Sequence, residues 1–159
     1  MKFVLDSCTV LNLINGGALL PLVHSHIEEF ILTQAVYDEC PTCRDVLDLL
    51  IAQGCICLND VEIPLEEYKK VLACKVGPGE TESIALCLLN DNYFLCCDDR
   101  KARKCAIAHI TKNRVTGTIG LLQRMTANDI LECLEAQENY TLMRNKGAFL
   151  PDIDLGILC

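Results

Sequence analysis

Several acidic side chains stand where an apolar segment of this 159-residue chain ends or where a helix is expected to begin. They are Asp6, Glu39, Glu80, Glu82, Asp98 and Asp99. Carboxylates that gather in one crevice repel one another unless their pKa values rise or a cation compensates their charge. Their oxygens are hard ligands that select Mg²⁺ or Mn²⁺, and these ions also bind substrate phosphate. The acids therefore predict a divalent-metal site, provided that the fold brings them together.

A site of this kind suits the hydrolysis of phosphodiester bonds. Two divalent ions about 4 Å apart activate a water molecule and stabilise the leaving oxygen of an in-line displacement. Taken singly, each acid also has a structural explanation. Asp6 fits a helix cap, Glu80 fits a helix N-terminus, where the dipole favours negative charge, and Glu39 fits an exposed surface. Their joint occurrence at segment ends favours the metal site.

The segments that must position these acids alternate between strand and helix. Apolar runs predict strands at residues 2–6, 30–33, 55–58, 93–97 and 114–116. Helical patterns cover residues 7–13, 18–24, 36–51, 65–73, 80–90, 100–109 and 117 to about 144. Ser7 is the expected cap of the first helix, and Pro41 is expected to interrupt the third.

This alternation predicts a three-layer α/β/α sandwich around a central parallel sheet. In such sheets, ligands bind beyond the carboxyl ends of the strands. Asp6 ends the first predicted strand and the pair Asp98-Asp99 ends the fourth, so both should project from the same edge. We expect Glu39, near the start of the helix after the second strand, and Glu80, after a glycine-rich turn, to lie at that edge too.

Composition and length indicate one globular domain. Hydrophobic residues make up 51% of the chain and charged residues 23%. We expect residues 1–159 to form a single domain in which 125–159 are a helical C-terminal extension. No apolar run approaches the roughly 18 residues of a membrane span, and polar residues interrupt the first apolar stretch. The expectation is a soluble, cytoplasmic protein without membrane association.

The net charge of −8 argues against simple electrostatic binding of nucleic acid. One short segment nevertheless holds six of the 14 basic residues, namely Arg100, Lys101, Arg103, Lys104, Lys112 and Arg114. Such a run is compatible with a solvated helix face and with a local patch that contacts phosphate. Its position directly after Asp98-Asp99 would suit the second interpretation.

Twelve cysteines are present, many of them inside apolar segments. Free cysteine behaves there as a small hydrophobic residue, so we expect most of them to be reduced and buried. One group has the spacing of metal ligands, because a CxxC pair is followed by a CxC pair. Its members, Cys40, Cys43, Cys55 and Cys57, are candidates for a structural Zn²⁺ site.

The motifs together resemble those of PIN domains, the nuclease fold of VapC-type toxins and of several RNA-processing enzymes. The matching segments span residues 2 to about 124. They are Phe3-Val-Leu-Asp6-Ser7, Val36-Tyr-Asp-Glu39, Gly79-Glu80-Thr-Glu82-Ser-Ile-Ala-Leu86, Leu95-Cys-Cys-Asp98-Asp99-Arg100 and Val115-Thr-Gly117-Thr-Ile-Gly120. The glycine–glutamate, Asp-Asp-Arg and Thr-Gly-Thr elements look most like a prokaryotic subgroup found among toxin–antitoxin candidates.

This resemblance implies an Mg²⁺- or Mn²⁺-dependent endoribonuclease in which activated water, rather than a covalent nucleophile, attacks the phosphodiester. The implied metal ligands are Asp6, Glu39, Glu80 and Asp98 or Asp99, with Glu82 as a substitute for Glu80. The implied RNA contacts are Ser7, Arg100, Arg103, Lys104 and Thr116. The third acid is glutamate here, where the better-known toxins usually have aspartate. The resemblance also implies a homodimer and an antitoxin protein as partner.

Other functions fit the sequence less well. A phosphatase of the haloacid-dehalogenase type needs a second aspartate two residues after Asp6, and this chain has Cys8 there. No glycine loop of the Walker A type is present. The main alternative is a PIN-like module that binds RNA or protein without cleaving it, with zinc at the cysteine group.

Overall fold

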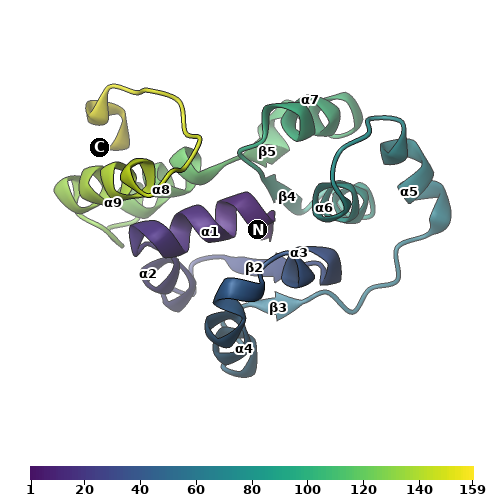
Figure 1. Ribbon diagram of the computed structural model, residues 1–159, viewed down its shortest axis with the longest axis horizontal. Helices are drawn as coiled ribbons and strands as arrows, with labels where there is room; N and C mark the ends of the chain where they lie inside the picture. Colours follow the sequence, from purple (N-terminus) through teal and green to yellow (C-terminus); the bar gives the residue numbers. More distant parts are fainter.

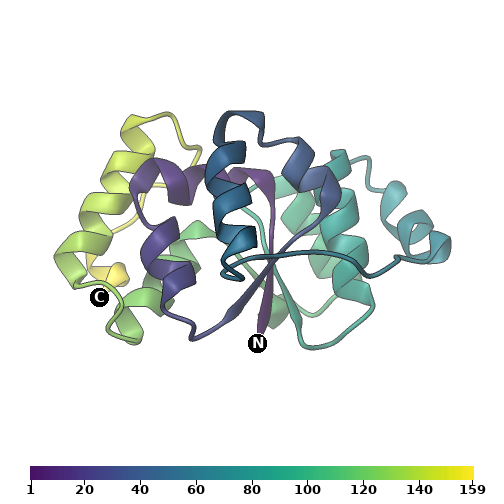
Figure 2. The same ribbon diagram turned by 90° about the horizontal axis from the view of Figure 1, so that it is seen from below.

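A computed structural model describes residues 1–159 and contains one five-stranded parallel sheet with the strand order β3-β2-β1-β4-β5 (Figure 1). The strands are β1 (Lys2–Leu5), β2 (Glu29–Leu32), β3 (Cys57–Leu58), β4 (Tyr93–Cys96) and β5 (Val115–Thr116). All four strand pairs are parallel. In Figure 2, β1 rises from the N-terminus toward the upper rim, so the carboxyl ends of the strands lie along that rim.

Helices cover both faces of this sheet. They are α1 (Ser7–Gly16), α2 (Leu19–His24), α3 (Gln34–Asp38), α4 (Arg44–Ala52), α5 (Leu65–Leu72), α6 (Pro78–Leu88), α7 (Arg100–His109), α8 (Thr118–Ala127) and α9 (Cys133–Asn145). Single 3-10 turns occur at Pro41–Cys43, Lys112–Arg114 and Leu155–Leu158. In Figure 1, α1, α2, α8 and α9 lie on one side of the sheet and α5, α6 and α7 on the other. The predicted three-layer sandwich is therefore confirmed.

Alternate side chains of each strand enter different cores, because successive strand residues point to opposite faces. Phe3 and Leu5 belong to the larger core, which is completed by α1, α8 and α9. Val4 belongs to the smaller core under α6 and α7. Helix α9 packs against α1, and Met143 and Leu158 are buried in the larger core, so residues after 125 share the core of the sheet.

The structure corrects several local expectations. Asp6, not Ser7, is the N-cap of α1, since its side chain accepts a hydrogen bond from the backbone N–H of Thr9. The helix ends at Gly17, whose φ of 78° is accessible to glycine. The predicted helix over residues 36–51 is split into α3, a 3-10 turn and α4. Proline supplies no N–H at the start of that turn, which explains the break at Pro41.

The cysteines are mostly free, as predicted, and six of the eight free ones are buried. Two disulfides join Cys74 to Cys105 and Cys133 to Cys159. No helix has the length and apolar character needed to cross a membrane.

Candidate metal centre

Asp6 and Asp98 follow the two strands at the centre of the sheet. Strands β1 and β4 pair in parallel, with Leu5 opposite Cys96, so the residues after them meet at the same rim (Figure 2). From β1 the chain connects to β2 on one side, whereas from β4 it connects to β5 on the other. The carboxyl ends of strands at such a reversal form a crevice in open α/β sheets, and ligands bind there.

Asp6 is the most deeply buried of the acids, with 1% of its surface exposed. Its Oδ1 accepts the hydrogen bond from the N–H of Thr9 at 2.7 Å, but its Oδ2 is buried and receives no hydrogen bond from an N–H or O–H group. The thiol of Cys97 lies beside this carboxylate and lowers its pKa. Burial raises the pKa of Asp6 to about 6, and the charge of Asp98 contributes to the rise. A buried carboxylate oxygen without a partner is costly, and a cation would offset that cost. Asp6 thus fits a metal ligand.

Glu39 follows α3 and is fixed by two hydrogen bonds. Its Oε2 accepts from Ser7 Oγ at 2.9 Å, and its Oε1 accepts from the backbone N–H of Gly79 at 2.8 Å. The residue therefore lies at the end of a short helix, not near the start of a long one as predicted. The expectation for Glu39 was wrong because the helix begins at Gln34, before the predicted start at Val36, and ends at Asp38.

Glu80 lies in the first turn of α6, in the same neighbourhood. Burial raises its pKa, and the charges of Asp99 and Glu39 raise it further. The adjacent Gly79 donates to Glu39, so the first turn of α6 lies beside that acid.

Asp98 and Asp99 have different local roles. Asp98 accepts hydrogen bonds at both oxygens, from the side-chain amide of Asn12 at 2.9 Å and from the N–H of Thr118 at 2.9 Å. The hydroxyl of Thr118 donates to Asp98 as well. Asp99 is exposed and caps α7, since its Oδ1 accepts from the N–H of Ala102 at 2.7 Å. Its other oxygen accepts no hydrogen bond from the protein.

Cys8 lines a pocket at this rim together with Asp98 and Asp99. Partial desolvation of its thiol and the charges of four carboxylates raise its pKa to about 11. Those carboxylates belong to Asp6, Glu80, Asp98 and Asp99. The acids do not form a closed cage, because no three of their oxygens lie within 4.8 Å of one another.

A comparison with known protein families decides the family. Residues 2–153 match a family described as a PIN domain. The chain belongs to the PIN-domain family. Members of this family are generally nucleases that use divalent metals. No curated protein and no solved structure gave a significant match.

Glu82 of this PIN domain is fixed by two hydrogen bonds. Its Oε2 accepts from the N–H of Ala35 at 2.7 Å, and its Oε1 accepts from the hydroxyl of Tyr68 at 3.1 Å. Ala35 stands in the first turn of α3, three residues after β2 ends, so Glu82 also reaches the carboxyl edge of the sheet. Glu82 thus ties α6 to α3 and α5, and its role as a substitute for Glu80 stays a prediction.

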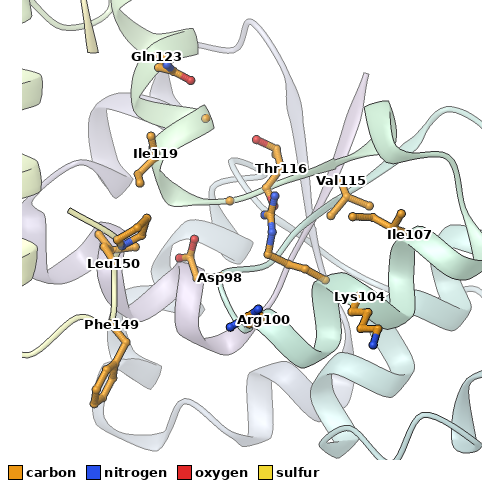
Figure 3. A pocket seen from close by; sticks show the side chains of 14 residues that line it. Asp98, Arg100, Lys104, Ile107, Val115, Thr116, Ile119, Gln123, Phe149 and Leu150 are labelled. Atoms are coloured by element: carbon orange, nitrogen blue, oxygen red, sulfur yellow. The ribbon is translucent and has the colours of Figure 1, made fainter. Parts of the chain in front are cut away.

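A groove of about 990 Å³ runs beside Asp98 and contains most of the residues expected to contact RNA. In Figure 3, Asp98 lies between Phe149 on one side and Lys104 on the other, with Arg100 nearby. Thr116 also lines the groove, whereas Ser7 lies with Glu39 outside it.

Arg103 is held by the backbone within this groove. Its Nη1 donates to the carbonyl oxygen of Cys97 at 2.8 Å and to that of Thr116 at 2.5 Å. This guanidinium therefore joins the ends of β4 and β5. Arg100 and Lys104 are exposed and remain available to phosphate.

Arg114 does not belong to the basic patch that the sequence suggested. It is 9% exposed and donates to the carbonyl oxygens of Cys87 and Asn90. It also pairs with Asp91 at 2.9 Å. These contacts lie where β4 and β5 begin, at the edge of the sheet opposite the acids. Arg114 thus stabilises the fold there.

The four cysteines proposed for zinc do not form a site in this structure. No three of their sulfur atoms lie within 4.8 Å of one another. Cys40, Cys43 and Cys55 are buried in the larger core, and Cys57 is exposed on β3. Cys40, Cys43 and Cys55 therefore act as small core residues.

Sequence reasoning missed Asn12 and Thr118, the two residues that hold Asp98. Asn12 is only 8% exposed, although it stands in the apolar helix α1. A polar residue on the buried side of such a helix requires a hydrogen-bond partner, and this was the available signal. For Thr118 the signal was weaker, because a threonine at a helix start is common.

Proposed function

We propose that this PIN domain is a metal-dependent endoribonuclease that hydrolyses phosphodiester bonds of RNA. The observation that carries the proposal is the buried, partnerless Oδ2 of Asp6 at a rim shared by several carboxylates. Such an arrangement is costly for stability unless a cation binds, because burial and like charge both oppose ionisation.

Mg²⁺ or Mn²⁺ would be held by Asp6, Glu39, Glu80 and one of the pair Asp98 and Asp99. When bound, the ion supplies Lewis-acid activation of water and neutralises charge on the phosphoryl group. The protein orients its carboxylates through fixed donors, such as Ser7 and Gly79 for Glu39.

The protein itself offers no activated side-chain nucleophile at this rim. Cys8 and Cys97 are thiols near the acids, and the pKa of each is raised, that of Cys8 to about 11, which keeps both protonated at neutral pH. The thiolate is the nucleophilic form of cysteine, so covalent catalysis by Cys8 is disfavoured. Hydrolysis by water is the chemistry that the residues support.

The groove of Figure 3 is the proposed path of the RNA. Arg100 and Lys104 are exposed cations at its wall and would contact the phosphate backbone. The side chain of Phe149 is 99% exposed beside them. An exposed aromatic ring next to a basic groove is suited to stack on an unpaired base, which favours single-stranded RNA as the substrate.

The proposal is tested with metal-stripped protein and a fluorescent single-stranded RNA. Wild-type protein should cleave the RNA after Mg²⁺ or Mn²⁺ is added, and Asp6→Asn should abolish cleavage. Asp129→Asn changes an exposed acid that follows the end of α8 and is the matched control. Equal cleavage by the wild type and Asp6→Asn would contradict the proposal, as would metal-independent cleavage. DNA of the same sequence measures the preference for RNA.

A second candidate is a PIN-like module that binds RNA or protein without cleaving it. It is favoured by the spacing of the acids, since no three of their oxygens lie within 4.8 Å. Tight binding of single-stranded RNA with no cleavage under any divalent metal would support this function.

We also propose that the protein acts as a toxin in the cytoplasm and that an antitoxin protein is its partner. We further propose that it forms a homodimer. Several exposed apolar side chains near the C-terminus offer contact surface, namely Leu134, Leu142, Phe149, Leu155 and Ile157. Growth arrest on expression, absent for Asp6→Asn, would support the toxin role. Sedimentation of the purified protein as a monomer at micromolar concentration would contradict the homodimer.

A further inference from the structure

Three ligand-type side chains gather where the loop after α5 meets α7, away from the acidic rim. Cys105 and His109 are four residues apart in α7 and therefore lie on the same helix face. Cys74 comes from the loop after α5, and its Cα lies 5.9 Å from that of Cys105. The Nε2 of His109 is 3.8 Å from the Sγ of Cys74.

This group is the only cluster of three or more Cys, His, Asp or Glu residues whose ligand atoms all lie within 4.8 Å of one another. Two thiolates and an imidazole are a ligand set of Zn²⁺, which binds sulfur at about 2.3 Å and nitrogen at about 2.0 Å. A tetrahedron with these bond lengths separates its ligand atoms by roughly 3.5 to 3.8 Å. The contact between His109 and Cys74 is already close to this separation.

In the structure Cys74 and Cys105 are joined as a disulfide, which leaves neither sulfur as a thiolate ligand. We propose that the reduced form of this site binds one Zn²⁺ through Cys74, Cys105 and His109, with water as the fourth ligand. The disulfide is then the metal-free state of the same residues. This site is independent of the carboxylate centre and of the proposed nuclease activity.

The two states interconvert by a balanced exchange with a low-molecular-weight disulfide. The two protein thiolates give up two electrons and form the Cys74–Cys105 bond, and Zn²⁺ leaves. The oxidant takes up these two electrons together with two protons from solvent. Its sulfur–sulfur bond breaks, and two thiols form.

The location of the cluster allows metal to enter and gives it a structural effect. His109 is exposed and Cys74 half-buried, so the ligands can be reached from solvent, while Cys105 is 5% exposed. Lys101 of α7 also donates to the carbonyl oxygen of Lys75 at the same junction. Metal binding would therefore replace the disulfide as the link between α7 and the loop that leads into α6.

The test uses the full chain reduced with a phosphine, which takes an oxygen atom from water as it opens the disulfide into two thiols. Excess Mg²⁺ occupies the carboxylates, and Co²⁺ is titrated as a spectroscopic substitute for Zn²⁺. We expect the thiolate-to-cobalt charge-transfer absorbance to saturate at one equivalent and to vanish when Zn²⁺ is added. Thermal melting should show that Zn²⁺ stabilises the reduced protein.

Variants identify the ligands. Cys74→Ser should abolish the absorbance, and His109→Asn should weaken Co²⁺ binding at least about tenfold. Both positions have solvent exposure, so the variants should fold. Cys57→Ser and His26→Asn change an exposed cysteine and an exposed histidine elsewhere and should bind as the wild type does. Absence of the absorbance in the reduced wild type, or its retention in Cys74→Ser, would overturn the proposal.

Discussion

The backbone N–H of Gly79 donates a hydrogen bond to Oε1 of Glu39 at 2.8 Å, which joins the first turn of α6 to the acid that follows α3. A Cβ atom on residue 79 would lie 2.5 Å from Oε2 of Glu39. A side chain at residue 79 would therefore force the carboxylate of Glu39 to move.

Gly79→Ala should displace the carboxylate of Glu39 and weaken binding of Mg²⁺ or Mn²⁺ by about 10- to 100-fold. The clash involves the end of a flexible side chain, so the fold should persist. Calorimetric titration and the cleavage rate measure the effect. Gly156→Ala is the control, because its nearest neighbour would be 3.3 Å away. Unchanged metal affinity in Gly79→Ala would mean that Glu39 is not a ligand.

The metal-free protein should lose stability as the pH rises through the titration of Asp6. The pKa of Asp6 is about 6 in the folded protein and 3.8 ordinarily, so the folded state binds the proton more tightly. The free energy of unfolding should therefore fall between about pH 4 and pH 6, by roughly 3 kcal/mol, and remain lower above that range.

Asp6→Asn should remove this pH dependence, because asparagine keeps the helix cap and carries no charge. Urea unfolding in the presence of a chelator, at several pH values, measures the difference between the two proteins. Asp60→Asn should retain the wild-type profile, since that residue is exposed. If wild type and Asp6→Asn showed parallel profiles, the burial cost assigned to Asp6 would be wrong.

Substitutions at Asp98 and Asp99 should separate structure from metal binding. Asp98→Asn places an amide donor against donors from Asn12 and Thr118 and should destabilise the protein by about 1–3 kcal/mol. Asp99→Asn keeps the cap of α7 and should change stability by less than about 0.5 kcal/mol. Thermal melting measures both. A loss of metal affinity in the stable Asp99→Asn would assign Asp99 as the ligand.

Two neighbouring cations of α7 should respond differently to truncation. Arg103→Ala removes the side-chain donor of the carbonyl oxygens of Cys97 and Thr116 and should cost about 1–3 kcal/mol of stability, although Thr116 still accepts from the N–H of Cys97. Lys104→Ala should leave stability nearly unchanged and reduce the slope of log affinity for RNA against log salt by about one. Melting and salt-dependent binding assays measure these effects. A stable Arg103→Ala would contradict the structural role of Arg103.

Phe149→Ala should weaken binding of single-stranded RNA by about 1–3 kcal/mol, since one stacked base is lost. Phe149→Tyr should restore binding, because stacking needs only the aromatic ring. Fluorescence anisotropy measures both variants, with Leu134→Ala as a control at an exposed apolar residue of α9. If RNA affinity were the same for Phe149→Ala and wild type, the groove would not be the RNA path.

The order of strands and helices could be derived from the sequence because each element follows from local pattern. Apolar runs such as residues 93–97 need burial on both faces of a sheet, and helical segments between them require parallel connections. Once the strands are parallel, Asp6 and Asp98 must emerge at one edge. The sequence itself therefore determined that these two acids share an edge, whereas the pairing of β1 with β4 in the tertiary structure made them neighbours.

The tertiary structure decided which polar groups complete the site, because that depends on helix phase and on loops far apart in the chain. Gly79 of α6 binds Glu39, and Glu82 of the same helix binds the start of α3. Arg103 binds backbone carbonyl oxygens near the groove, and Cys74 meets Cys105 across 31 residues of sequence. Periodicity reports which face of an element is buried, whereas packing between elements determines what each polar side chain touches.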